Sequence, residues 1–266
     1  MLDRYNREIN YLRISVTDRC NLRCHYCMPE NDPCLLRHED IMRFEEIREV
    51  VGVAVSMGVD KIRLTGGEPL VRKDIVDLVS MIASISGVKD LAMTTNGVLL
   101  SNYAASLAKA GLHRVNISLD TIDPVKFRSL TRGGDIQKVF KGINAARHAR
   151  LEPIKINCVI TESPDEADAM QVGSFCRAEG LQVRYIPKMD LQLGHFGVVD
   201  GGSGGDCGSC NRLRLTSDGK IKPCLFSDIA YDIRITGIRK SLEMALGNKP
   251  EKGTINLSNC FHNIGG

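Results

Sequence analysis

The chain has 266 residues and lacks several features that would assign it to a broad class of protein. It has no apolar run long enough to span a membrane, which argues against a transmembrane protein. Its N-terminus lacks the apolar core of a signal peptide, and its net charge of +3 is too small to indicate nucleic-acid binding. Tryptophan is absent, which excludes nothing. We therefore expect a cytoplasmic protein without a membrane or nucleic-acid partner.

Cysteine, by contrast, is plentiful. Ten cysteines without an export signal indicate a reducing compartment, where clustered cysteines bind metal more often than they form disulfides. The remaining composition, 43% hydrophobic and 25% charged, is that of an ordinary globular protein. Such a chain is long enough for one large core with a small appended subdomain.

Three of the cysteines, Cys20, Cys24 and Cys27, follow an apolar, strand-like run. Three thiolates hold three corners of a cubic iron–sulfur cluster and leave the fourth iron open for a small molecule. A zinc site would need a fourth ligand, and His25 is poorly placed for this because it lies between two of the cysteines. A disulfide would need an even count and an oxidising compartment. The spacing therefore favours an iron–sulfur cluster.

A second set of cysteines consists of Cys207, Cys210 and Cys224. Residues 212–217 and 220–226 are typical of a hairpin that turns at Ser-Asp-Gly, and this hairpin would bring the third cysteine back to the other two. Again there are three ligands, with Cys260 near the tail as the alternative fourth. The chemistry suggests a second cluster with one open iron, so that one cluster activates a cofactor while the other holds a substrate.

Strand-like and helix-like runs alternate along the first two thirds of the chain. Six β–α units imply a parallel sheet, too few to close an eight-stranded barrel. An open partial barrel and a flat doubly wound sheet remain as alternatives, and both bind ligands at the carboxyl ends of their strands. The expected strands are residues 11–16, 61–65, 90–94, 114–119, 154–160 and 182–187, and the expected helices are residues 44–57, 73–83, 102–110, 124–130, 136–148 and 165–179.

The carboxyl ends of the expected strands bring polar segments to one edge. The segment that follows the second strand reads Thr-Gly-Gly-Glu-Pro, residues 65–69. Glycines there let the backbone approach a ligand closely, and Glu68 is suited to accept a hydrogen bond from a cationic amine. A simple β–α turn is the alternative. The other segments expected at this edge are residues 20–27, 94–97, 118–120 and 187–190.

Basic residues lie on or beside most of these strands. Cations inside a barrel are costly unless they meet anions, so several together favour an anionic substrate such as a polyphosphate. Arg212 and Arg214 alternate with leucines and therefore face one side of the hairpin, with a solvated hairpin face as the alternative. The full set is Arg13, Lys61, Arg63, Lys155, Arg184, Arg212 and Arg214.

The cysteine spacing with Tyr26, together with the Gly-Gly-Glu-Pro run, resembles the radical S-adenosylmethionine superfamily. The wider context resembles the GTP 3′,8-cyclases of molybdenum cofactor biosynthesis. The segments that carry this narrower resemblance are residues 12–21, 61–70, 94–97, 116–120, 210–216 and 224–227, and the Gly-Gly terminus.

The resemblance implies two [4Fe-4S] clusters and S-adenosylmethionine as cofactors. Cys20, Cys24 and Cys27 would hold the first cluster, whose open iron binds the amino and carboxylate groups of S-adenosylmethionine. Cys207, Cys210 and Cys224 would hold the second, whose open iron contacts guanine. The cofactor would be lined by Tyr26, Gly67, Glu68, Ser118 and Met189, the GTP by Arg13, Lys61, Arg63, Thr94, Lys155, Arg212 and Arg214, and the catalytic residues would be Arg184, Gly265 and Gly266.

The implied reaction is that of a lyase. A 5′-deoxyadenosyl radical takes the ribose 3′ hydrogen of GTP, and the resulting carbon radical attacks C8 of guanine to give (8S)-3′,8-cyclo-7,8-dihydroguanosine 5′-triphosphate. The implied partners are an electron donor such as flavodoxin or ferredoxin and the downstream cyclic pyranopterin monophosphate synthase, with a possible homodimer. The implied fold is α/β, with a partial, open (β/α)6 barrel of the TIM type over residues 1–190 and a C-terminal second-cluster region over residues 191–266.

One departure from the family pattern concerns residues 190–206, a segment shorter than its counterpart there, which contains Gly-Gly-Ser-Gly-Gly. The main alternative is therefore a related two-cluster enzyme that acts on another nucleotide or on a peptide; the basic residues favour a nucleotide. An electron-transfer or carrier protein is a further alternative, against which the Gly-Gly-Glu-Pro run argues, because a carrier needs no cofactor pocket. A structural zinc protein would be colourless.

Overall fold

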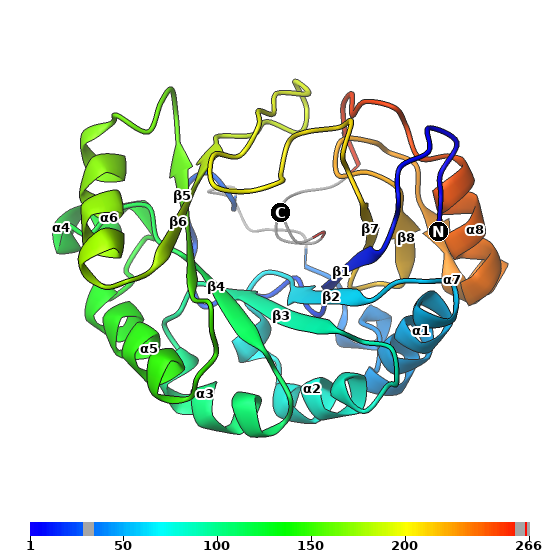
Figure 1. Ribbon diagram of the computed structural model, residues 1–266, viewed down its shortest axis with the longest axis horizontal. Coiled ribbons are helices and arrows are strands. Elements are labelled where there is room, and N and C mark those ends of the chain that lie inside the picture. The colour runs from blue at the N-terminus through cyan, green and yellow to red at the C-terminus, as the bar shows by residue number, and fades with distance from the viewer. Residues whose placement is uncertain (29–34, 259–263, 265–266) are drawn as a thin grey trace.

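The computed structural model describes residues 1–28, 35–258 and 264, and it contains one curved sheet of nine strands. Helices cover the outer face of this sheet, and the sheet bends around an open interior (Figure 1). The strand order is β6-β5-β4-β3-β2-β1-β7-β8-β9. The strands are β1 (Tyr11–Ser15), β2 (Lys61–Thr65), β3 (Asp90–Thr95), β4 (Arg114–Ser118), β5 (Lys155–Ile160), β6 (Gln182–Pro187), β7 (Arg212–Leu215), β8 (Lys220–Lys222) and β9 (Tyr231–Asp232).

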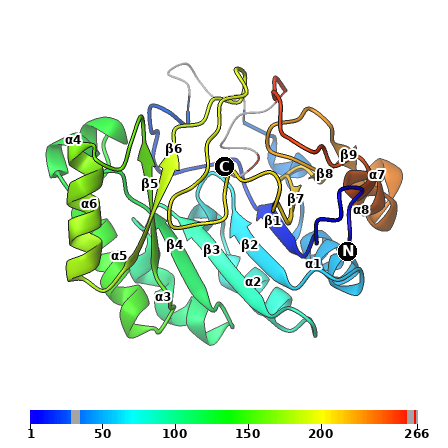
Figure 2. The ribbon, with the colours of Figure 1, turned by 45° about the horizontal axis from the view of Figure 1, so that its top comes forward.

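The first six strands pair in parallel in sequence order, and one or two helices follow each of the first five, whereas β6 continues into the connection to β7. This confirms the six expected strands and the six expected helices, whose ends lie within two residues of the expected ones. Two of the helices lie between β4 and β5, however, so the sixth strand lacks the helix of a complete β–α unit. The α/β, open partial barrel is therefore confirmed, and the flat doubly wound alternative is not the observed shape (Figures 1 and 2). The helices of this part are α1 (Phe44–Ser56), α2 (Ile75–Ala83), α3 (Leu100–Lys109), α4 (Pro124–Leu130), α5 (Ile136–His148) and α6 (Ala167–Ala178), with the 3-10 turns η1 (His38–Asp40) and η2 (Pro69–Val71).

The core lies between the outer face of the sheet and the helices. Ile14, Leu64 and Ile117 are inaccessible to solvent, and they pack with apolar helix residues such as Leu78 and Val139. Because the helices bury this face, its side chains are apolar, whereas the inner face of the strands is free to carry polar groups. The charged side chains of the strands therefore point into the interior of the partial barrel, which contains the candidate site described below.

Local sequence sets the helix ends. Asp123 and Asp135 accept hydrogen bonds from backbone N–H groups in the first turns of α4 and α5, as N-cap residues do. Gly111 follows α3 with φ of 100°, a conformation that residues with a side chain rarely adopt. The two aspartates thus fix where α4 and α5 begin, and Gly111 lets the chain turn from α3 toward β4.

The C-terminal part continues the same sheet from its β1 edge. β7 pairs in parallel with β1, and Arg13 lies opposite Arg214 in that pair. β8 returns antiparallel to β7, which confirms the expected hairpin with shorter strands. The sequence pattern predicts one more helix at residues 237–246, and α8 (Ile238–Gly247) begins and ends one residue later. β9 and the short helix α7 (Ile233–Thr236) were not predicted.

The connection from β6 to β7, drawn in yellow, crosses between the two sides of the open sheet (Figures 1 and 2). Asp200 in this connection exchanges two backbone hydrogen bonds of 3.0 Å with Tyr185 of β6. Residues 190–206 are thus anchored to the edge strand through Asp200. In the described part of the chain, no helix combines the length and apolar character needed to cross a bilayer.

Candidate active site

The first cysteine set lies in the loop after β1, at the carboxyl ends of the strands. Burial, together with the neighbouring Cys27 and Cys20 thiols, raises the pKa of Cys24 to about 12. The three thiols are therefore close enough to repel one another's negative charge. Asn96 Nδ2 donates to the Cys20 sulfur at 3.7 Å, and Leu22 N donates to it at 3.4 Å. Hydrogen bonds to a cysteine sulfur are a common feature of iron–sulfur ligands.

The described Cys, His, Asp and Glu side chains form no group of three that fits a single metal ion. A cubic cluster is larger than one ion and takes thiolates that lie farther apart, and donor sets made of three cysteines suit its chemistry.

The Gly-Gly-Glu-Pro turn after β2 packs directly against the cysteine loop. A Cβ at position 67 would lie 2.3 Å from the carbonyl oxygen of Arg19, so only glycine fits there. Gly67 N and Glu68 N donate to the carbonyl oxygens of Thr17 and Arg19, each at 2.8 Å. The two segments that are expected to hold the first cluster and its cofactor are thus one packed unit.

Glu68 is the buried carboxylate of this unit. It accepts hydrogen bonds from Leu70 N at 3.0 Å, the Thr95 hydroxyl at 2.7 Å and Asn96 N at 2.6 Å. Burial raises the pKa of its carboxyl to about 7. Among the described residues, no basic side chain forms an ion pair with it. A buried carboxylate with this surrounding suits the cationic amine of a ligand.

Tyr26 and Asp120 connect the cysteine loop to the end of β4. The Tyr26 hydroxyl donates to Asp120 Oδ2 at 2.8 Å, and Val159 N donates to Asp120 Oδ1 at 2.8 Å. Ser118 lies two residues before Asp120, at the carboxyl end of β4. Met189, from the segment after β6, lines the adjoining cavity. The expected cofactor residues therefore lie at neighbouring strand ends.

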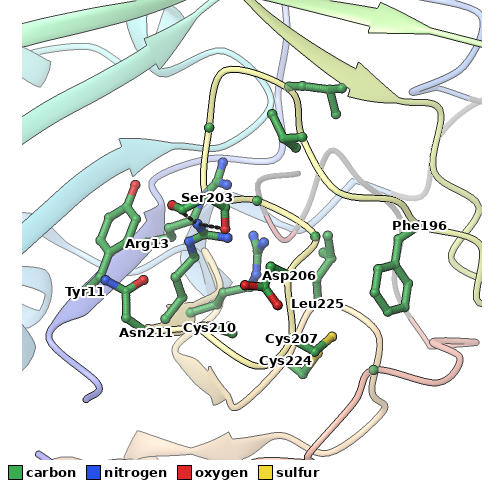
Figure 3. Close-up of a pocket in the computed structure, with 18 of the residues that line it drawn as sticks. Tyr11, Arg13, Phe196, Ser203, Asp206, Cys207, Cys210, Asn211, Cys224 and Leu225 are labelled. Carbon is green, nitrogen blue, oxygen red and sulfur yellow. Dashed lines mark hydrogen bonds between the residues drawn. The ribbon is translucent and has the colours of Figure 1, made fainter. Parts of the chain in front are cut away.

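The second cysteine set lines one cavity of about 370 Å³ on the inner face of the sheet. Cys207, Cys210 and Cys224 lie close together at one end of it (Figure 3). Burial raises the pKa of Cys224. Burial acts in the same direction at Cys210, but the charges of Lys249 and Arg212 and the hydrogen bond from Arg212 N together lower its pKa. The volume falls in the range of small-molecule pockets.

The cavity wall is strongly basic. Burial and the neighbouring Arg212 lower the pKa of Arg214 to about 10. Burial and adjacent arginines also lower the pKa values of Arg13, Arg63 and Arg184. Among the described residues, the wall contains six arginines and two lysines but only two aspartates, and one of these, Asp90, pairs with Arg114. Such mutual repulsion is relieved by a polyanion.

Most of the basic residues expected at the site meet in this cavity. Arg214 is only 7% exposed, so the alternative of a solvated hairpin face is wrong for it. Thr94 and Lys155 do not line the cavity itself. Thr94 has a buried hydroxyl without a partner in the described structure, and the pKa of Lys155 is lowered by burial and by Arg184. The expected residues that do line the cavity are Arg13, Lys61, Arg63, Arg184, Arg212 and Arg214.

The short connection from β6 to β7 forms part of the same wall. Arg212 Nη2 donates to both the carbonyl oxygen and the hydroxyl of Ser203, each at 2.9 Å (Figure 3). The residues predicted to be catalytic in the tail, Gly265 and Gly266, lie outside the described residues, as does Cys260, the alternative fourth ligand.

Sequence reasoning missed several residues of the site. Asn96 and Asp120 stand inside motifs that were recognised, so their position in those motifs was a usable signal. Lys249 and Arg7 gave no such signal, because their contacts join segments far apart in the chain.

Comparison with known proteins agrees with this geometry. The sequence model of the radical SAM superfamily matches residues 14–172, and that named Molybdenum Cofactor Synthesis C matches residues 168–252. A GTP 3′,8-cyclase of Alkaliphilus oremlandii is 39% identical over 95% of this chain and 94% of its own, and one of Moorella thermoacetica is 41% identical over 88% of this chain and 86% of its own. The structure of Streptococcus suis SuiB bound to S-adenosylmethionine superposes with a TM-score of 0.69 at 16% identity, over 92% of this chain and 66% of SuiB.

These matches define first a class and then a family within it. The fold and the first cysteine set are those of a radical SAM enzyme, a class that implies a [4Fe-4S] cluster and S-adenosylmethionine. Within that superfamily, the chain belongs to the GTP 3′,8-cyclase family. The alignment with the Alkaliphilus protein extends over 300 positions, more than the 266 residues of this chain, so part of the relative has no counterpart here.

Proposed function

We propose that this chain is a GTP 3′,8-cyclase that carries out the first step of molybdenum cofactor biosynthesis. The observation that carries the proposal is the basic cavity beside the second cysteine set. A nucleoside triphosphate brings several negative charges, which the repelling arginines of the wall are suited to receive. The same cavity exposes three cysteines that fit a second [4Fe-4S] cluster.

The cluster of the first cysteine set and S-adenosylmethionine, when bound, supply a 5′-deoxyadenosyl radical. The chain's own residues bind and orient the reactants. Glu68 offers a buried carboxylate to the cofactor's amine, and Gly67 lets the turn lie against the cysteine loop. Tyr26 is held by Asp120, which keeps this loop in place.

On the substrate side, Arg13, Arg63 and Arg214 come from three adjacent strands that share one register. Fixed strands give these guanidinium groups a fixed spacing, which suits a substrate that must be held in one orientation for the ribose carbon to meet guanine C8. The second cluster would hold guanine at the other end of the cavity. Correct orientation is the main contribution we assign to the protein.

The shortened segment bears on which substrate is used. Residues 201–205 lie against Arg184 and Arg212 and therefore border the proposed triphosphate site. A related enzyme acting on another nucleotide would keep the same arginines, whereas a peptide substrate would make little use of them.

Anaerobic incubation of the reconstituted protein with S-adenosylmethionine, dithionite and GTP tests the proposal. Mass spectrometry is expected to find 5′-deoxyadenosine together with an isomer of GTP. If 5′-deoxyadenosine forms while GTP stays unchanged, the chain is a radical SAM enzyme but GTP is not its substrate. A parallel incubation with ATP serves as the control, because it has the same triphosphate but a different base.

A further inference from the structure

A lysine ammonium lies buried beside the second cysteine set. Lys249 follows α8, is only 1% exposed and lines the cavity. Its Nζ donates to the carbonyl oxygen of Arg212 and to that of Pro223, both at 2.7 Å. The thiols of Cys210 and Cys224 line the same cavity. An ammonium has three N–H donors, so these two carbonyl oxygens accept from two of them.

These contacts join two cysteine-bearing segments. Arg212 lies two residues after Cys210, and Pro223 directly precedes Cys224. One ammonium therefore fixes the backbone on both sides of the hairpin that carries two of the three cysteines.

Arg7, near the N-terminus, binds the segment that contains Cys207, the remaining cysteine of the second set. Its guanidinium donates to the carbonyl oxygen of Cys207 at 2.8 Å, and to those of Pro250 and Glu251 at 2.7 and 2.9 Å. Its Nε donates to Asp3 at 2.7 Å, in a pair that is almost fully buried. Arg7 thus ties the Cys207 segment to the two residues that follow Lys249.

The charges of these two cations are balanced differently. Asp3 pairs with Arg7, but among the described residues no carboxylate forms an ion pair with Lys249. A buried ammonium without an anion is costly. The negative charge available to Lys249 is that of the thiolates, because Cys210 and Cys224 flank the two carbonyl groups that it binds and line the same cavity.

We propose that Lys249 positions the second cysteine set and compensates its negative charge. Arg7 supports this role by holding the backbone of Cys207 against the residues that follow Lys249. The inference rests on the proposed role of this set as a cluster site. Three thiolates and a cubic cluster together carry net negative charge, and this charge grows on reduction. An adjacent ammonium therefore stabilises the cluster, and stabilises its reduced form more.

The test is anaerobic reconstitution of the full chain as Lys249→Met, which removes the charge and all three donors and keeps a similar volume. Iron and acid-labile sulfide are counted per chain, and EPR-monitored redox titration follows each cluster without GTP. We expect iron to fall from about eight toward about four atoms per chain, because each cubic cluster holds four. The remaining second cluster should have a more negative midpoint potential, while 5′-deoxyadenosine formation at the first cluster persists.

Lys252→Met is the matched control, because it makes the same change three residues along at an exposed side chain, and it should keep the full iron content. Full iron in Lys249→Met, or an unchanged midpoint potential of its second cluster, would overturn the proposal. A general loss of stability lowers occupancy without shifting the potential.

If Lys249→Met does not fold, Arg7→Gln carries the test, with selective loss of second-cluster iron expected and equal loss from both clusters contradicting it. These readouts need no GTP, so a failure of the cyclase proposal is seen separately.

Discussion

The hydroxyl of Tyr26, in the first cysteine loop, donates a 2.8 Å hydrogen bond to the carboxylate of Asp120 at the end of β4. Burial raises the pKa of Asp120, while Val159 N and the Tyr26 hydroxyl oppose this shift as donors. The loop that carries three cysteines is thereby fastened to a strand end 94 residues away.

Replacing Asp120 should loosen this loop. Asp120→Ala leaves the Tyr26 hydroxyl and Val159 N without their acceptor, which costs about 1–3 kcal/mol. We expect the affinity for S-adenosylmethionine to fall roughly tenfold or more, since 1.4 kcal/mol is a factor of ten. Isothermal titration of the reconstituted protein measures this. Tyr26→Phe removes one donor only and should have the smaller effect; equal affinities in all three proteins would contradict the account.

Position 67 should tolerate no side chain. Gly67→Ala places a methyl group 2.3 Å from the Arg19 carbonyl oxygen, and the neighbour is backbone that cannot swing away. Overpacking of this kind costs about 1–3 kcal/mol, and we expect loss of the first cluster as well. Denaturant unfolding and iron analysis measure both effects. Gly52→Ala, inside α1 with no atom within 4 Å of the new Cβ, should instead be neutral or stabilising by up to about 1 kcal/mol.

Glu68 should make the metal-free protein less stable as pH rises. Its pKa is about 7 in the folded state against an ordinary value of 4.5, so between these values the folded state binds the proton more tightly than the unfolded state. The free energy of unfolding therefore falls across this window, by on the order of 1 kcal/mol per pH unit, and levels off above about pH 7.

The difference between unaltered protein and Glu68→Gln isolates this contribution, because glutamine has no proton to lose. Urea unfolding at pH 5, 6, 7 and 8 provides the comparison. Glu162→Gln, at an exposed position, should keep the slope of the unaltered protein. Parallel pH profiles for all three proteins would show that Glu68 does not titrate in this range.

The hairpin arginines, Arg212 and Arg214, should contribute to GTP binding but not to the iron content of the protein. Arg212→Ala combined with Arg214→Ala removes two cations from the cavity wall. Hydrogen bonds to charged groups contribute about 1.5–3 kcal/mol each, so we expect the GTP dissociation constant to rise at least tenfold with iron content unchanged. Arg177→Ala, on the exposed side of α6, is the control. Unaltered GTP binding in the double variant would remove both arginines from the substrate site.

Much of the barrel could be predicted because its signals are local. Apolar runs such as residues 61–65 and 182–187 gave strand bounds that the structure reproduces. Glycines after helices and the spacing of the cysteines are equally local. Parallel strands then bring their carboxyl ends to one edge by geometry, which is why Cys20, Glu68 and Asn96 meet.

What could not be predicted depends on contacts distant in sequence. Arg7 donates a hydrogen bond to the carbonyl oxygen of Cys207, which is 200 residues away in the chain. No sequence pattern around either residue predicts this contact. The two-residue strand β9 is too short to show a period, and it exists because it pairs with β8. Likewise, only the pairing of β7 with β1 reveals that the second cysteine set shares the interior of the barrel.

Transfer of a label from substrate to cofactor tests the central claim most directly. The reconstituted protein would be given GTP carrying deuterium at the ribose 3′ position, with S-adenosylmethionine and dithionite, and the 5′-deoxyadenosine would be weighed by mass spectrometry. The account predicts 5′-deoxyadenosine heavier by one deuterium, together with a cyclised nucleotide that has lost it. Unlabelled 5′-deoxyadenosine beside intact GTP would contradict the assignment of the basic cavity to GTP.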